Sequence, residues 1–507
     1  MSTSLRFVRR FLDDYARNPA NLLLLALVPM VFVVVVAGSM AEAAELLGGV
    51  GGPAVETAAA GWAAAFLAGI SMYFQIAATH ETDSRVVIAG LRPRSLVCAR
   101  LLTGLTLALG ASGAALIALA IRTGIHEPAR VVPGTLMFAV IYVAVGAVVA
   151  VIARNPVNGT LIVLFVWIID VFFGPAMGAT DRRVTRGLPT HFVTLWMVDL
   201  PSRHGGRLGD LGWAVLWTSS AVAIAWVLAT ARVRTAKTRP QATAGSRRAQ
   251  LRAAGRGSWQ DARRNPAQWV LFVVVPLVFI LGADAVTPDE PLSLVLRERG
   301  ADLVRTFPMP AVHGATMAPI AIAAVCAVVG LFVMLDSRAG DRRVALAGLR
   351  PGALLSARFG VLALLTMTAT AVSLTATSTV VDIARWPVYA AANLLVGLTY
   401  GLVGALLAPL FGRVGGVFLA FLLPFLDLAI VQSPMLNPEP TALSKVLPGY
   451  GGSRVLIDAA LTNGFDQAGP LLVGLAWLVA LVVVVSLIFR HSTRRPRMAA
   501  DRMVLAA

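Results

Sequence analysis

The stretch NLLLLALVPMVFVVVVAG, residues 21–38, contains no charged side chain. A helix needs roughly 20 such residues to cross the ~30 Å hydrocarbon core of a bilayer. The whole chain shares this character, because 57% of its 507 residues are hydrophobic and only 14% are charged. A soluble domain is roughly 45–50% apolar. The sequence therefore predicts an all-α integral membrane protein.

About twelve apolar runs of this kind follow one another along the chain. They lie near residues 21–40, 60–79, 98–121, 132–152, 157–177, 211–231, 267–286, 316–335, 354–379, 387–411, 414–433 and 469–489. An arginine-rich stretch precedes the first run and no small-residue cleavage site follows it. We therefore interpret the first run as a retained span and not as a signal peptide.

The net charge of +17 follows the loops between these runs. With the amino terminus placed inside, the inner segments carry 30 of the 43 basic residues; these segments are 1–18, 85–100, 154, 232–264, 338–358, 413 and 490–502. Cytoplasmic loops of membrane proteins have this excess of Lys and Arg. We expect a multi-pass protein of the plasma membrane, embedded in the lipid bilayer, with both termini cytoplasmic and no nucleic-acid partner.

Two stretches repeat one pattern, DSRVVIAGLRPRSLVCAR at 83–100 and DRRVALAGLRPGALLSAR at 341–358. Other landmarks recur in the same order, namely RNPA at 17–20 and 264–267, Tyr142 with Gly146 and Tyr400 with Gly404, and Asp170 and Asp427. The order predicts an internal duplication with a first six-span module at 1–231, a basic cytoplasmic linker at 232–257 and a second module at 258–507. Two six-span modules share one orientation, so we expect parallel repeats that form a pseudo-dimer with a path between them.

The repeated loop between spans two and three places apolar residues among charges, Val86, Ile88 and Leu91 in the first copy. Apolar side chains on a cytoplasmic loop indicate docking to a partner. The alternative is that they pack beneath their own bundle.

The predicted elements are, in order, an amphipathic helix before the first span, a second span ending in an acidic residue, and a loop helix before a third span that begins with Arg. This order resembles that of the type-2 exporter permeases of the ATP-binding cassette (ABC) transporters. In that family the loop is a coupling helix that seats in a cleft of the ATPase subunit. The resemblance implies the following docking residues: Glu81, Asp83, Arg85, Ile88, Leu91, Arg92, Asp341, Arg343, Leu346, Leu349 and Arg350.

The chain contains no G-x-x-x-x-G-K-[ST] phosphate loop, so we expect no ATP hydrolysis by this polypeptide. The resemblance then implies separate ABC ATPase subunits, two copies for the two loops, which carry the ATP and Mg²⁺. Two separate cysteines and six scattered histidines form no metal-binding motif. We expect no catalytic residues, no bound metal and no cofactor on this chain.

Two carboxylates, Asp170 and Asp427, fall well inside predicted spans. A charge there costs roughly 2.5–3.5 kcal/mol on insertion scales and by default marks a functional site. Each lies towards the outer end of its span, which leaves two interpretations open, capping of a helix or a role in a transport path.

Short apolar segments before the last span of each module, LPTHFVTLWMVDL at 188–200 and LPGYGGSRVLIDAAL at 447–461, are too short to cross. We expect outer helices that dip into the membrane, as in the exporter family. A plain surface helix is the alternative.

The main rival interpretation is a secondary transporter of the major-facilitator type, which also has twelve spans in two parallel halves. The sequence AGDRRVALAGLR at 339–350 is faintly similar to that family's loop motif but lacks the Gly-Arg-Arg ending. A membrane enzyme or scaffold is the third possibility. Hydrophobic drugs or lipids as substrates, and export as the direction, follow only from the exporter resemblance.

Overall fold

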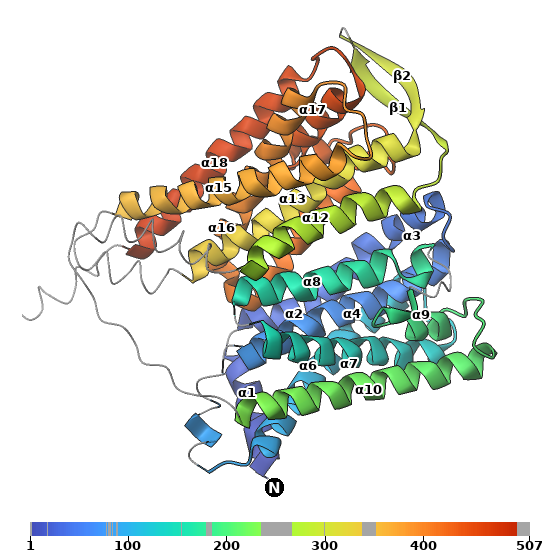
Figure 1. Ribbon diagram of the computed structural model, residues 1–507, viewed down its shortest axis with the longest axis vertical. Coiled ribbons are helices and arrows are strands. Elements are labelled where there is room, and N and C mark those ends of the chain that lie inside the picture. The colour runs from blue at the N-terminus through green and yellow to red at the C-terminus, as the bar shows by residue number, and fades with distance from the viewer. Residues whose placement is uncertain are drawn as a thin grey trace, which may run out of the picture.

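The computed structural model describes residues 3–17, 19–77, 79, 83, 85–87, 90–153, 155–178, 185–234, 266–298, 300–336 and 351–493. Long apolar helices lie side by side in two groups (Figure 1). We call residues 3–234 the N-terminal half and residues 266–493 the C-terminal half. The predicted all-α membrane fold is confirmed.

The N-terminal half begins with a surface helix that leads into a series of long helices. Its elements are α1 (Thr3–Ala16), α2 (Pro19–Val31), the π-helical η1 (Phe32–Val36), α3 (Ala37–Leu46), α4 (Gly52–Ala77), α6 (Pro93–Arg122), α7 (Pro128–Ile152), α8 (Pro156–Phe172), the 3₁₀ turns η2 (Pro175–Met177) and η3 (Thr185–Gly187), α9 (His191–Met197) and α10 (Gly206–Arg234).

The C-terminal half follows a similar order of elements and adds one hairpin. Its elements are α12 (Pro266–Val286), β1 (Pro291–Glu298), β2 (Ala301–Pro308), α13 (Met309–Leu335), α15 (Pro351–Thr377), α16 (Trp386–Pro424), the π-helical η4 (Phe425–Val431), the 3₁₀ turn η5 (Ser444–Val446), α17 (Tyr450–Leu461) and α18 (Ala468–Thr493).

Every one of the twelve predicted apolar runs falls on a helix. Ten helices of the described residues are long and apolar enough to cross a membrane. One of them is the continuous 46-residue stretch Trp386–Val431, which Gly412 interrupts with a φ of 68°. Because this break lies between the predicted runs 387–411 and 414–433, it divides the stretch into those two spans. The remaining run is the shorter helix α8, Pro156–Phe172.

The hairpin of β1 and β2 was not predicted. Its strands pair antiparallel from Pro291 opposite Pro308 to Glu298 opposite Ala301. Leu294 and Leu296 are buried, whereas the alternate residues Ser293, Val295 and Arg297 are more exposed, as expected for a strand with one covered face. The leucines at every second position, Leu292, Leu294 and Leu296, are the signal in the sequence for this strand.

The two ends of the helical bundle carry different elements (Figure 1). α1, the end of α10, the start of α15 and the end of α18 lie at one end. α3, α9, α17 and the hairpin lie at the other. The first and last described helices thus share one end, as an even number of crossings requires, and we call it the inner end because the predicted cytoplasmic loops belong there.

Glycines allow the central helices of each half to approach closely. A Cβ atom added at Gly146 of α7 would lie 2.2 Å from the carbonyl oxygen of Gly69 in α4. A Cβ atom at Gly404 of α16 would lie 1.8 Å from the carbonyl oxygen of Ala327 in α13. Small residues at helix interfaces let backbones meet in membranes, so the paired landmarks Gly146 and Gly404 occupy matching contacts.

We expect Gly146→Ala to destabilise the protein, because the methyl group must push α4 and α7 apart. Ala is otherwise the better helix former by roughly 0.5–1 kcal/mol. A matched control is Gly113→Ala, since nothing lies within 4 Å of a Cβ at Gly113 in α6. Thermal unfolding in detergent should show a lower unfolding midpoint for Gly146→Ala than for the parent protein, and no decrease for Gly113→Ala. Equal midpoints for both variants would contradict the close approach.

Candidate functional site

The two halves meet along α2, α4 and α8 on one side and α12, α13 and α16 on the other. Aromatic rings fill the middle of this interface. Phe66 of α4 lies 5.2 Å from Phe418 and 5.3 Å from Phe421 of α16, measured between ring centroids. Trp167 of α8 lies 5.0 Å from Phe66 and 5.4 Å from Phe421. We call these four residues the aromatic cluster.

The aromatic cluster is buried and held in place. Each of its four side chains is at most 3% exposed. The indole N–H of Trp167 donates to the carbonyl oxygen of Trp62 at 2.8 Å, which satisfies the one polar atom of that ring. Edge-to-face and stacked aromatic pairs contribute about 0.5–1.5 kcal/mol beyond their buried area. The cluster therefore closes the middle of the interface.

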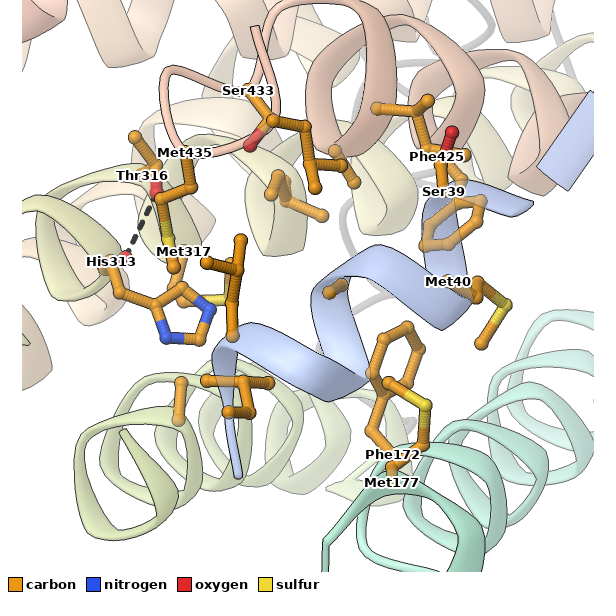
Figure 2. A pocket seen from close by; sticks show the side chains of 18 of the residues that line it. Ser39, Met40, Phe172, Met177, His313, Thr316, Met317, Phe425, Ser433 and Met435 are labelled. Carbon is orange, nitrogen blue, oxygen red and sulfur yellow. Dashed lines mark hydrogen bonds between the residues drawn. The ribbon is translucent and has the colours of Figure 1, made fainter. Parts of the chain in front are cut away.

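A cavity of about 110 Å³ lies between the halves on the outer side of the cluster. Figure 2 shows side chains from both halves around it, with Met40 and Phe172 from one and Met317 and Phe425 from the other. We call it the outer cavity. Its volume is smaller than the roughly 150 Å³ cavity that holds benzene in an engineered protein. A larger molecule needs more space than the cavity offers in this structure.

The lining of the outer cavity is apolar and adaptable. It includes four methionines and four phenylalanines, namely Met40, Met177, Met317, Met435, Phe172, Phe173, Phe279 and Phe425. Methionine is flexible and polarisable and is common on surfaces that accept varied apolar partners. The polar lining residues are Ser39, His313, Thr316 and Ser433. The His313 ring lies 2.6 Å from the Thr287 hydroxyl through Nδ1, and the Thr316 hydroxyl donates to the His313 carbonyl (Figure 2).

Asp170 is buried near the outer end of α8 and accepts three hydrogen bonds. The donors are the Tyr142 hydroxyl at 2.9 Å, the Thr190 hydroxyl at 2.8 Å and the Thr190 backbone N–H at 3.1 Å. Thr190 is the N-cap residue of the short outer helix α9. The carboxylate therefore ties the beginning of α9 to α7 and α8.

Asp427 makes the matching contacts in the C-terminal half. It accepts from the Tyr400 hydroxyl at 2.5 Å, from the Gly449 backbone N–H at 2.8 Å and from the Gln432 amide at 3.1 Å. Gly449 is the N-cap residue of α17. Because the first backbone N–H groups of a helix lack intrahelical partners, these contacts favour the capping interpretation of both carboxylates.

An arginine side chain binds the C-terminal end of each short outer helix, α9 and α17. Arg130 donates to the Trp196 carbonyl at 2.9 Å and lies 3.3 Å from Asp199. Arg385 donates to the Thr462 carbonyl at 3.0 Å and to Asp458 at 2.6 Å. Hydrogen bonding to Arg207 and then to Arg130 lowers the pKa of Asp199. Neither arginine was singled out from the sequence. Each stands near the start of its span, at α7 and at α16.

The predicted docking residues are only partly within the described residues. Glu81, Ile88, Asp341, Arg343, Leu346, Leu349 and Arg350 lie outside them. Arg85 and Arg92 are exposed and Leu91 is half-buried. Asp83 instead points into the protein, where it accepts from Arg100 at 2.7 Å and from the Thr79 hydroxyl at 3.0 Å. Its docking role stays a prediction, and its contacts make it an anchor for the loop.

The surface helix α1 contacts this anchor. The Arg100 guanidinium lies 3.6 Å from the centroid of the Phe11 ring, within the range of a cation–π interaction. Leu5, also on α1, is 48% exposed. One chain of contacts therefore runs from α1 through Arg100 to Asp83 in the loop.

Among the described residues, no group of three or more His, Cys, Asp or Glu side chains could hold a metal ion. No protein-family model matches the chain, and no curated protein resembles it significantly. The interface between the halves and the inner loop are therefore the features of this chain that bear on its function.

Proposed function

We propose that this chain is the transmembrane permease of an ABC exporter, with hydrophobic molecules moving between its two halves. The observation that carries the proposal is the outer cavity, which both halves line with flexible methionines and phenylalanines above a closed aromatic cluster. Such a cavity suits an apolar molecule, and its small volume suits a closed state of an alternating path.

Matching contacts in the two halves support an origin by duplication. Tyr142 and Asp170 hold the N-cap of α9 as Tyr400 and Asp427 hold that of α17. These contacts fix the short outer helices to their own half. Each half can then move as a unit, and separation of the halves opens the aromatic cluster.

The energy source is proposed to be a separate ATPase that docks at the inner end. The chain itself has no phosphate loop. Asp83 and Arg100 connect the exposed part of the loop to α1 and to α6. A movement of the loop is therefore transmitted to α1 and α6 at the inner end of the N-terminal half.

The test is reconstitution of the full chain with the phosphate-loop ATPase encoded beside it in the genome. We expect the two proteins to purify together. Proteoliposomes should move a hydrophobic dye, rhodamine 6G, only when ATP is supplied. Leu91→Asp should reduce ATP-driven transport at least about tenfold, because a carboxylate in an apolar contact costs more than 1.4 kcal/mol.

The control is Leu303→Asp, which changes a leucine that is 42% exposed on β2 at the outer end. It should leave transport unchanged. Dye movement by the chain alone in a proton gradient, without ATP or the ATPase, would replace the exporter proposal with the facilitator one.

A further inference from the structure

A second cavity, of about 550 Å³, lies at the inner end of the bundle. We call it the inner cavity. Its walls come from α1, the end of α4, the start of α6 and the part of α16 that follows Gly412. Arg413 and Val414 bring the C-terminal half into the wall, so a molecule bound here touches both halves.

One wall of the inner cavity is a single face of α1. Phe7, Arg10, Phe11, Asp14 and Tyr15 recur at the three- and four-residue spacing of one helical face. Phe74 of α4 also lines the cavity. The wall therefore offers aromatic rings beside charged groups, at the depth where an interfacial helix meets lipid headgroups.

Polar side chains that line the inner cavity keep hydrogen-bonding capacity. Both amide atoms of Gln75 and Nε of Arg100 have no hydrogen-bond partner, and the buried Ser71 hydroxyl pairs with the Tyr15 hydroxyl. Ser71 is 2% exposed and Arg100 is 7% exposed. Leaving such a buried group unpaired costs roughly 1–3 kcal/mol, so a bound polar group at this position stabilises the protein.

The charges on the lining favour an anion. Both lining carboxylates are already paired, Asp83 with Arg100 at 2.7 Å and Asp14 with Arg17 at 3.0 Å. Three arginines, Arg10, Arg100 and Arg413, line the cavity against these two aspartates, and Arg413 also pairs with Asp336 at 2.8 Å. The groups that remain to meet a bound molecule are mainly donors, namely Arg10, the Gln75 N–H groups and Arg100 Nε.

We propose that the inner cavity binds the phosphate headgroup of an anionic phospholipid. The phosphate oxygens accept from Ser71, Gln75 and Arg100, and the acyl chains leave along the aromatic face of α1. Basic pockets between membrane helices on the cytoplasmic side recognise anionic lipid headgroups in this way. The lipid then connects α1, the loop at Asp83 and both halves. This proposal requires only that the chain is embedded in a membrane, so its test is independent of the proposed transport activity.

The experiment measures thermal unfolding and lipid binding of the delipidated full chain in detergent. The probes are dioleoylphosphatidylglycerol, dioleoylphosphatidylcholine and free glycerol 3-phosphate. We expect phosphatidylglycerol to bind and to raise the unfolding midpoint, phosphatidylcholine to bind at least tenfold more weakly, and glycerol 3-phosphate to compete only at far higher concentration.

The informative variant is Ser71→Ala combined with Gln75→Leu. Without lipid it should be nearly as stable as the parent, because the Gln75 amide atoms have no partner and Ser71 loses only its hydrogen bond with Tyr15. Its affinity for phosphatidylglycerol should fall about tenfold or more, since two hydrogen bonds of about 1 kcal/mol each are lost. Ser112→Ala is the matched control, because the Ser112 hydroxyl is buried and unpaired but does not line the inner cavity.

Three results would overturn the proposal. The first is unchanged affinity for phosphatidylglycerol in the Ser71→Ala, Gln75→Leu variant. The second is equal binding of phosphatidylcholine, which removes the requirement for an anion. The third is binding of glycerol 3-phosphate as tight as that of the lipid, which identifies a soluble phosphate as the source.

Discussion

Replacing Asp170 with alanine is expected to lower the free energy of unfolding of the protein by about 3 kcal/mol. The carboxylate receives three hydrogen bonds from Tyr142 and Thr190. Its removal leaves all three donors buried and unpaired, at roughly 1 kcal/mol or more for each. Thermal unfolding of the full chain in detergent, followed by tryptophan fluorescence, measures the loss.

Two further substitutions separate anchoring from a role in the transport path. Asp170→Asn keeps one acceptor oxygen. If Asp170 acts only as an anchor, this variant should keep part of the stability of the parent protein, and the folded variant should transport at the parent rate. Tyr142→Phe removes only one hydrogen bond and should cost about 1 kcal/mol. A variant Asp170→Asn that unfolds like the parent but no longer transports would contradict the anchoring role and restore the interpretation as a path residue.

Asp427→Ala should behave in the same way, because Tyr400, Gly449 and Gln432 depend on that carboxylate. The comparison also tests the duplication. Two copies of one device should show similar losses, whereas a stability loss confined to Asp170 would mean that the two halves use their carboxylates differently.

The spans could be predicted from the sequence because membrane insertion depends on local composition. Each run of about 20 apolar residues forms a helix in order to satisfy its own backbone in lipid, whatever its neighbours are. Gly412 marks the break between two runs for a similarly local reason, its positive φ. The hairpin at 291–308 was not predicted, because the alternating pattern of a short strand is a weaker sequence signal than the long apolar run of a membrane span.

The partners of the buried carboxylates could have been inferred in part. Tyr142 and Asp170 recur together as Tyr400 and Asp427, and two polar residues kept in both copies of a span pair are candidates for contact. The hydrogen bond from Arg130 to the end of α9 could not be inferred, because its partner, the Trp196 carbonyl, lies 66 positions away in the sequence. The aromatic cluster and both cavities also required the structure, since they depend on how the two halves pack together.

The second large effect is expected at the inner end, where Arg100→Met should destabilise the protein by about 3–5 kcal/mol. The change leaves the Asp83 carboxylate, which is 7% exposed, without its cationic partner. Removing one member of a buried ion pair has this magnitude, because the remaining charge stays desolvated. A matched control is Arg17→Met, since the Arg17–Asp14 pair is exposed and should contribute less than about 1 kcal/mol.

The double variant Asp83→Leu, Arg100→Met distinguishes a charge effect from a packing effect. If the unpaired charge causes the loss, replacing both partners by apolar residues recovers most of the stability, because neither charge is then buried alone. A double-mutant cycle on unfolding midpoints gives the coupling between the two side chains. A double variant that is less stable than either single one would instead assign the loss to the packing of Arg100 against Phe11. If the chain is the proposed permease, we expect stability to recover without recovery of ATP-driven transport, because the apolar pair fills the space but no longer holds the loop by a directed hydrogen bond.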